Sequence, residues 1–133
     1  MPLNTNQQWY PNIGIGIVNH GNSKLDGSGS IVDILVPGHD GTLVNSITIK
    51  AQAVVSQGMI RFFIQPKIGT PYTIFREVIV PPYSQSDVLP SFTVILKGGF
   101  YLPAGSTLAA STQNSEPFVI TVDALDFENC PCS

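Results

Sequence analysis

The chain has 133 residues, of which 43% are hydrophobic and 11% are charged, so it is long enough for one sizeable core, too short for two ordinary domains and too apolar to be disordered. It contains 14 Ile, 12 Val and 9 Thr, and residues branched at Cβ favour strands, which excludes an all-helical fold. The formal net charge is −3, so the chain lacks a basic surface that could neutralise phosphates, and we expect no nucleic-acid partner.

Residues 1–12 are polar and rich in Asn and Gln, and they include the aromatic residues Trp9 and Tyr10. They contain neither the basic nor the apolar region of a secretory signal. No run in the chain approaches the roughly 18 apolar residues that a membrane span needs. We therefore expect an N-terminal arm on a soluble protein that is made in a cytosol and has no membrane partner.

Short runs of apolar and β-branched residues follow, separated by Gly, Pro, Asn and Ser. In residues 47–53 apolar side chains alternate with polar ones, which indicates a strand with one buried face. Ser56-Gln57-Gly58 is expected to join this strand to the next as a tight hairpin, with Gly58 at a positive φ. In chain order the predicted strands are 13–18, 30–36, 47–55, 59–65, 72–80, 91–97, 107–111 and 117–127.

No window of ten or more residues carries the apolar spacing of a helix, so the crossovers of a parallel sheet are missing and the strands must be antiparallel. About eight such strands favour an all-β fold, a single antiparallel β-sandwich of the jelly-roll type, over an immunoglobulin-like sandwich with its Cys-Trp-Cys pattern. The expected layout is an N-terminal arm over 1–12, the jelly-roll domain over 13–127 and a C-terminal tail over 128–133.

We predict no enzyme activity, no catalytic residue, no cofactor and no metal site, because no nucleophile, phosphate-binding or metalloprotease motif is present. The two histidines, His20 and His39, lie in glycine-rich turns. Residues 26–30 match an Asp-x-Ser-x-Ser metal motif, but that motif works at the end of a parallel strand. Cys130-Pro131-Cys132 could be half of a zinc site completed in trans, a redox pair or an inert tail, and we favour the tail.

Two charged residues interrupt apolar strands, Arg61 in 59–65 and Glu77 in 72–80. If those strands pair as a hairpin, Arg61 and Glu77 could form a cross-strand ion pair, or Glu77 could pair with a partner subunit. Phe62 and Phe63 must point to opposite faces of their strand, and an outward phenylalanine hints at an interface.

Several stretches of the chain also resemble a known family. They are Asp40-Gly41-Thr42 through Ile47–Ala51 to Gly58–Ile64, then Glu77–Val80, then Leu102-Pro103-Ala104-Gly105 through Leu108–Gln113 to Phe127. Over residues 30–127 they resemble a group of small virion proteins of tailed bacteriophages. In that family an Ile-Arg-Leu-Phe-Ile-like strand precedes a Lys-Glu-Ile-x-Val-like one, and a Leu-Pro-Ala-Gly turn precedes an Ala-Ser-Thr strand. The chain differs from this pattern in its arm and its Cys-Pro-Cys tail.

The resemblance implies an auxiliary capsid protein, of the decoration or cement type, that binds the major capsid protein on the outside of a tailed-phage head. It also implies a homo-oligomer, expected as a trimer, located in the virion. The arm would dock through Trp9 and Tyr10. The alternative is a receptor- or carbohydrate-binding jelly-roll module on a fibre or tail, whose loop aromatics stack on sugars. Its candidate residues are Tyr72, Tyr83, Phe100 and Tyr101.

Overall fold

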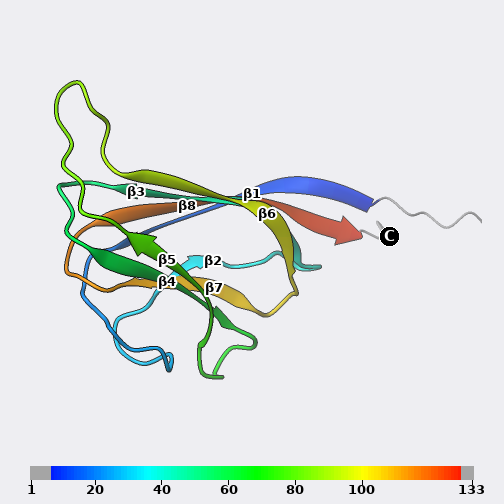
Figure 1. Cartoon of the computed structure of the whole chain (residues 1–133). Helices are drawn as coiled ribbons and strands as arrows, with labels where there is room; N and C mark the ends of the chain where they lie inside the picture. The colour runs from blue at the N-terminus through cyan, green and yellow to red at the C-terminus, as the bar shows by residue number, and fades with distance from the viewer. Residues whose placement is uncertain (1–6, 130–133) are drawn as a thin grey trace, which may run out of the picture.

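The computed structural model describes residues 7–129, which form eight strands (Figure 1). Among these residues there is no helix of the length and apolar character needed to cross a membrane. The strands are β1 Gln7–Val18, β2 Val32–Leu35, β3 Thr42–Ala51, β4 Gly58–Gln65, β5 Thr73–Val80, β6 Thr93–Leu102, β7 Thr107–Thr112 and β8 Phe118–Asn129.

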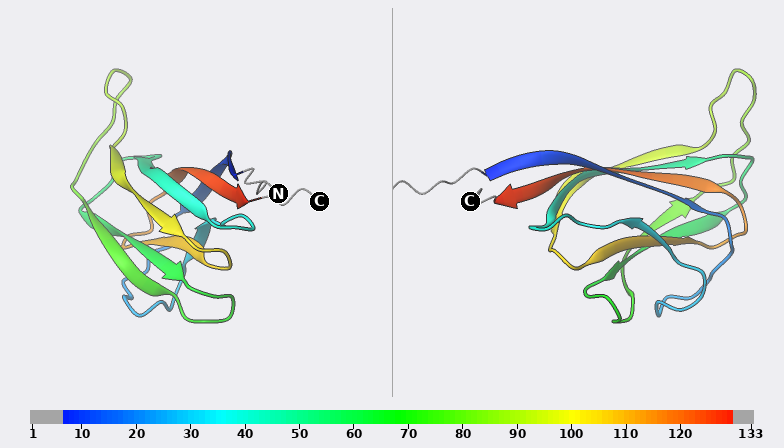
Figure 2. Two further views of the ribbon diagram at one scale, coloured as in Figure 1. Left: turned by 90° about the vertical axis from the view of Figure 1, so that its right-hand side faces the viewer. Right: turned by 180° about the vertical axis from the view of Figure 1, so that it is seen from behind.

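The strands form two antiparallel sheets of four that pack face to face (Figures 1 and 2). The A sheet has the order β1-β8-β3-β6, and the B sheet has the order β2-β7-β4-β5. Consecutive strands mostly alternate between the sheets, and only β4 and β5 are consecutive in the same sheet. The structure confirms the predicted all-β antiparallel sandwich.

The expected hairpin at Ser56-Gln57-Gly58 is wrong, because the strands that it would join, β3 and β4, belong to different sheets. The chain crosses between the sheets here, and Val55 forms an isolated bridge with Tyr83 on the way. Gly58 has no positive φ. A Cβ at Gly58 would lie 2.8 Å from Asn114 Nδ2, so its role is to let Asn114 approach. A short polar turn with a glycine does not by itself distinguish a hairpin from a crossing.

The core lies between the sheets and is built from the inward side of each strand. In β3 the buried residues alternate with polar ones, as the period of two requires. Phe62 and Phe118 are the largest aromatic side chains of this cluster. The main aliphatic members are Val44, Ile47, Ile49, Ile60, Leu108, Ile120 and Val122, each at most 1% exposed.

Strand β1 closes one edge of the sandwich by approaching β2 closely. Gly14 and Gly16 face inward, and a Cβ at Gly14 would lie 2.5 Å from the carbonyl oxygen of Ile34. A Cβ at Gly16 would collide with Cδ1 of the same Ile34. Glycine is therefore required at Gly14 for space rather than for an unusual backbone angle, whereas at Gly16 a larger residue would displace the end of the Ile34 side chain.

Residues 19–31, between β1 and β2, run along the outer face of the B sheet. The amide of Asn22 donates to the carbonyl of Thr112 at 2.7 Å, and Gly21 forms a parallel bridge with the same residue. Phe62 belongs to the central core, and Phe63 points outward but is still 0% exposed. The outward phenylalanine that hinted at an interface is thus buried within the chain itself.

Candidate docking surfaces

The first and last strands form a long ribbon. They pair from Gln7↔Asn129 to Val18↔Phe118, whereas the pairing of β8 with β3 ends at Asp126↔Thr42. The outer ends of β1 and β8 therefore project beyond the sandwich as a two-stranded ribbon (Figures 1 and 2). Of the expected arm, residues 7–12 are the first half of β1, so the boundary expected at residue 12 falls inside a continuous strand.

A polar cluster ties the root of this ribbon to the sandwich. Asn12 Nδ2 donates to Asp126 Oδ1 at 2.8 Å and to the carbonyl of Val36 at 3.2 Å. Thr42 Oγ1 and the Gly38 amide donate to the same carboxylate oxygen. Hydrogen bonds to a charged acceptor are stronger than neutral ones. The cluster therefore fixes the direction in which the ribbon leaves the domain.

The two docking candidates lie on this ribbon. Tyr10 is paired with Asp126, and 43% of its surface is exposed. Trp9 is paired through its backbone with Phe127, and its side chain lies outside the described part of the structure. Residues 1–6, the rest of the expected arm, and Cys130 and Cys132 also lie outside the described residues.

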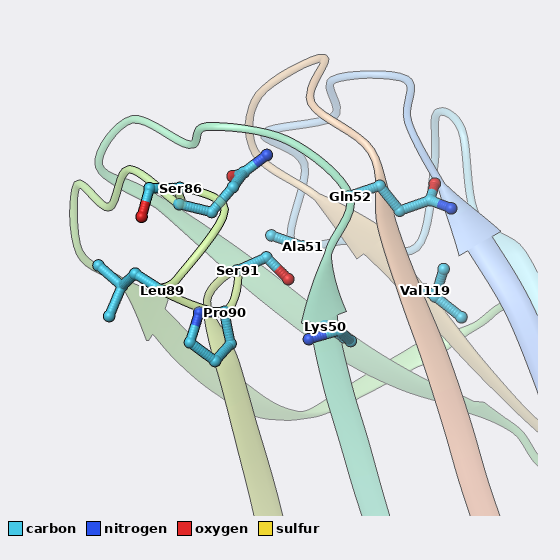
Figure 3. A pocket seen from close by; sticks show the side chains of 9 residues that line it. Lys50, Ala51, Gln52, Ser86, Leu89, Pro90, Ser91 and Val119 are labelled. Atoms are coloured by element: carbon cyan, nitrogen blue, oxygen red, sulfur yellow. The ribbon is translucent and has the colours of Figure 1, made fainter.

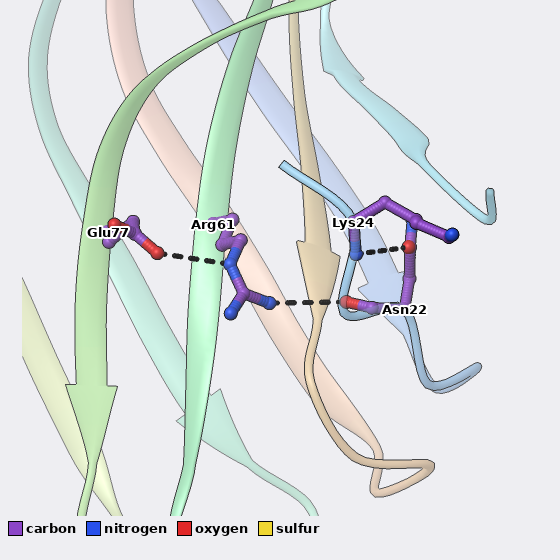
Figure 4. Close-up of polar contacts among 4 residues, drawn as sticks. All are labelled: Asn22, Lys24, Arg61 and Glu77. Atoms are coloured by element: carbon purple, nitrogen blue, oxygen red, sulfur yellow. Dashed lines mark hydrogen bonds and ion pairs between the residues drawn. The ribbon is translucent and has the colours of Figure 1, made fainter. Parts of the chain in front are cut away.

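Arg61 and Glu77 form the ion pair expected from the sequence (Figure 4). They are direct partners in the β4–β5 register, and Arg61 Nε donates to Glu77 Oε2 at 3.1 Å. Arg61 Nη1 also donates to the carbonyl of Asn22 at 3.2 Å. Arg61 is 8% exposed, so this guanidinium is a buried structural link between the B sheet and the covering segment 19–31.

Two of the four candidate glycan-binding residues donate hydrogen bonds from their hydroxyl groups to other residues of the chain. Tyr72 donates to Asp33 Oδ1 at 2.6 Å, and Tyr101 donates to the carbonyl of Asp40 at 2.8 Å. The hydrogen bond to Asp33, together with partial burial, raises the pKa of Tyr72 to about 12. Tyr72 lies on the B sheet side and Tyr101 on the outer face of the A sheet.

The other two aromatic candidates pack against neighbouring rings. Tyr83 meets Phe92 edge-on, with ring centroids 6.2 Å apart. Phe100 meets Phe75 edge-on at 5.4 Å, and the guanidinium of Arg76 lies over both of these rings. The structure thus distributes the four candidates over separate places and does not bring them together as one platform.

The connection between β5 and β6, residues 81–92, stands away from the sandwich (Figure 1). Val88 near its tip is 94% exposed. An open groove of about 530 Å³ lies at the base of this loop (Figure 3). It is lined by Lys50, Ala51, Gln52, Gln85, Ser86, Leu89, Pro90, Ser91 and Val119. Sequence reasoning missed the groove because segments far apart in the chain form it.

The two glycine-rich turns around Asp26 and His39, which the sequence analysis considered as metal-binding or catalytic sites, form local hydrogen bonds. The amide and hydroxyl of Ser28 donate to Asp26 Oδ1, at 3.1 and 2.6 Å, and these bonds lower the pKa of Asp26. The side chain of His39 is 92% exposed, with Nδ1 3.2 Å from Asp40 Oδ1. Over residues 7–129 no three His, Cys, Asp or Glu side chains gather as metal ligands would.

The chain is similar to known proteins in its fold and not in its sequence. No family model matches the sequence, and no curated protein is similar to it in sequence. A chain in the acidic stable capsid structure of Helicobacter pylori bacteriophage KHP30 superposes over 93% of this chain and 94% of its own length, with a TM-score of 0.55 and 8% identity. The chain has the fold of a phage capsid chain.

Two further solved structures are more distant. Eiger TNF from S. frugiperda matches with a TM-score of 0.48 and 14% identity, over 90% of this chain and 95% of that one. A chain of the Cowpea mosaic virus top component matches with a TM-score of 0.47 and 7% identity, over 91% and 86%. The likeness of fold therefore rests on the chain from the phage capsid structure, whose TM-score is 0.55.

Proposed function

We propose that the chain is a non-enzymatic structural protein of a virion, namely an auxiliary capsid protein that binds the major capsid protein on the outside of a tailed-phage head. The observation that carries the proposal is the β1–β8 ribbon, which projects from the sandwich. The fold shared with a chain of the KHP30 capsid supports the virion role. In this proposal the protein is made in the host cytoplasm, acts as a homo-oligomer, expected as a trimer, and is located on the capsid surface.

The ribbon suits docking because it is held in place before it meets a partner. Its strands are paired over their whole length, and the Asp126 cluster fixes its root. A preorganised element loses less conformational freedom on binding than a free tail does. Tyr10 supplies an exposed aromatic ring of the kind that commonly anchors interfaces. A homo-oligomer would present several ribbons at once, which raises the overall affinity without new contacts.

The test is co-sedimentation of the purified chain with heads of the phage that encodes it, prepared without this chain. The double variant Trp9→Ser/Tyr10→Ser is expected to leave the sandwich folded and to lose sedimentation with the heads. The control is Ile68→Ser, which removes an 82% exposed apolar side chain from the β4–β5 connection and should bind as the unchanged chain does. Equal sedimentation of the double variant and the control would exclude the ribbon as the docking element. An unchanged chain that stays in the supernatant would contradict the capsid role.

The alternative is a carbohydrate-binding module of a fibre or tail, and the groove under the 81–92 loop favours it. The amides of Gln52 and Gln85 and the hydroxyl of Ser86 could meet sugar hydroxyls there. None of the four candidate aromatics lines this groove, so it lacks the ring on which a sugar commonly stacks. We therefore place this function second.

A further inference from the structure

The outer face of the A sheet carries a stripe of exposed isoleucines. Ile13, Ile15 and Ile17 on the edge strand β1 are 66%, 65% and 49% exposed. Ile95 on β6 is 52% exposed, and Tyr101 on the same strand is 54% exposed. The three isoleucines of β1 present roughly 350 Å² of apolar surface, which is within the range of the largest patch on a typical monomer. Ile95 and Tyr101 lie on the opposite edge of the sheet, with β8 and β3 between.

The isoleucines point outward because the inward positions of β1 belong to glycine. Side chains alternate along a strand, so a residue between Gly14 and Gly16 must face the opposite side. The close approach of β2 leaves no room at Gly14 for a larger side chain, and at Gly16 a larger one would have to displace Ile34. The exposed stripe is therefore a fixed property of the strand register and is not the result of a side-chain rotation.

The chain covers the outer face of its other sheet over the middle strands β4 and β7 and leaves the outer face of the A sheet open. On the B sheet, Phe63 and Ala109 point outward and are still 0% exposed, and the segment 19–31 runs along that face. In the described part of the chain no segment crosses the A sheet in the same way (Figure 2). The open face is the one with the isoleucine stripe.

The charges on this face fit a second copy of the same chain. Three charged residues occupy outward positions of this face: Asp123 on β8, Lys50 on β3 and Lys97 on the edge strand β6. Asp123 and Lys97 lie in one cross-strand row, joined through Ser46. When two copies pack face to face about a two-fold axis, the carboxylate of one copy can therefore lie next to an ammonium group of the other. A stable interface buries about 800 Å² on each partner, so the contact has to include both apolar edges of the face and the half-buried Thr121 and Thr48 between them.

We infer that the outer face of the A sheet, centred on the isoleucine stripe of β1, is the surface on which two copies of this chain pack together. The inference rests on the homo-oligomer of the proposed function and not on its capsid partner. A contact of one face with itself joins the copies in pairs, so it replaces the expected trimer by an assembly built from dimers. It assigns the ribbon and the sheet face to different contacts, with the ribbon reaching the capsid and the face joining the copies.

The experiment measures the mass of the full chain in solution by light scattering at micromolar concentration. The unchanged chain is expected at a multiple of the mass of one chain. Ile15→Glu places a charge in the middle of the stripe and should raise the dissociation constant by at least about 100-fold, giving single chains. The control is Leu25→Glu, which adds the same charge at a 52% exposed position in the segment 19–31 and should not change the mass. Ile15→Thr, which keeps the β-branched shape, should weaken assembly less while keeping the circular dichroism spectrum of the fold.

Two results would overturn the inference: an unchanged chain that is a single chain in solution, or an Ile15→Glu variant that assembles as the unchanged chain does. If the unchanged chain is single and Ile15→Glu abolishes sedimentation with phage heads, the face contacts the capsid and the second copy is wrong. If the unchanged chain assembles, Ile15→Glu dissociates it, and neither sediments with heads, the inference stands and the capsid proposal fails.

Discussion

Replacing each of the two inward glycines of β1 by alanine tests how the edge of the sandwich closes. Both residues have ordinary extended backbone angles, so the two substitutions share the same benefit, about 0.4–1 kcal/mol from a less flexible unfolded chain. They differ in what the new methyl group meets. At Gly14 it meets the carbonyl oxygen of Ile34 at 2.5 Å, with Leu35 carbon atoms at 3.0 Å. At Gly16 it meets the movable end of the Ile34 side chain.

The backbone contact decides the size of the effect. Relief at Gly14 requires β1 and β2 to separate, and such overpacking costs about 1–3 kcal/mol. A contact of 2.5 Å with a backbone atom puts this cost near the upper end of the range. After the benefit is subtracted, Gly14→Ala should destabilise the protein by about 2 kcal/mol, which lowers Tm by roughly 6–8 °C for a chain of this size. At Gly16 a rotation of Ile34 relieves the collision, so the cost and the benefit nearly cancel. Gly16→Ala should change Tm by less than about 3 °C.

The assay is thermal unfolding followed by circular dichroism, with both variants and the unchanged chain at one protein concentration, because assembly makes Tm depend on concentration. Light scattering before heating checks that neither substitution changes the assembly. The reasoning would be refuted if Gly16→Ala lowered Tm as much as Gly14→Ala, or if Gly14→Ala left Tm unchanged.

Two further predictions concern side-chain contacts. Glu77→Gln removes the negative charge opposite the buried Arg61 and should lower the unfolding free energy by about 2–3 kcal/mol, whereas Arg61→Met, which removes the buried charge itself, should cost less. Urea unfolding compares the two variants, and a larger loss for Arg61→Met would contradict the expected order. The hydrogen bond to Asp33 raises the pKa of Tyr72 to about 12. The stability that this hydrogen bond contributes is therefore complete below pH 10 and is lost as the pH rises through 12. Ultraviolet titration should show one tyrosine ionising near pH 12, and Asp33→Asn should lower that value; four tyrosines that all titrate near pH 10 would disprove the contact.

The strands could be predicted where the hydrophobic pattern of the sequence agrees with the strand pairing in the structure. Each of the eight predicted runs overlaps a strand of the structure. The start of β1 was missed because Pro11 and Asn12 are poor strand formers and interrupt the local pattern, and the pairing with β8 carries the strand through them. The end of β6 was missed because Gly98 and Gly99 look like a turn. In the structure Gly98 has a φ of +107°, and the glycine pair forms a bulge opposite Asn45 of β3, so the strand continues.

The site was predictable only in part, for physical reasons that differ between residues. The Arg61–Glu77 pair follows from hairpin register alone, so the sequence could indicate it. Phe63 could be assigned to the outer face, but its complete burial there depends on contacts with distant parts of the chain, which no local pattern indicates. In β1 the Ile-Gly alternation was visible, yet apolar residues are ordinarily expected to face the core. Only the proximity of β2 shows that the glycines take that side.

The pairing of the first strand with the last also affects how the protein is made. Every residue pair of the β1–β8 ribbon joins positions at least about 100 residues apart, and contacts between such distant positions form slowly. During synthesis β1 emerges first and has no A sheet neighbour until β8 leaves the ribosome. Until then its isoleucines and its unpaired backbone groups are available to chaperones or to other nascent chains. The ribbon is therefore expected to form last, and its formation should be the folding step most sensitive to the concentration of copies of the same chain.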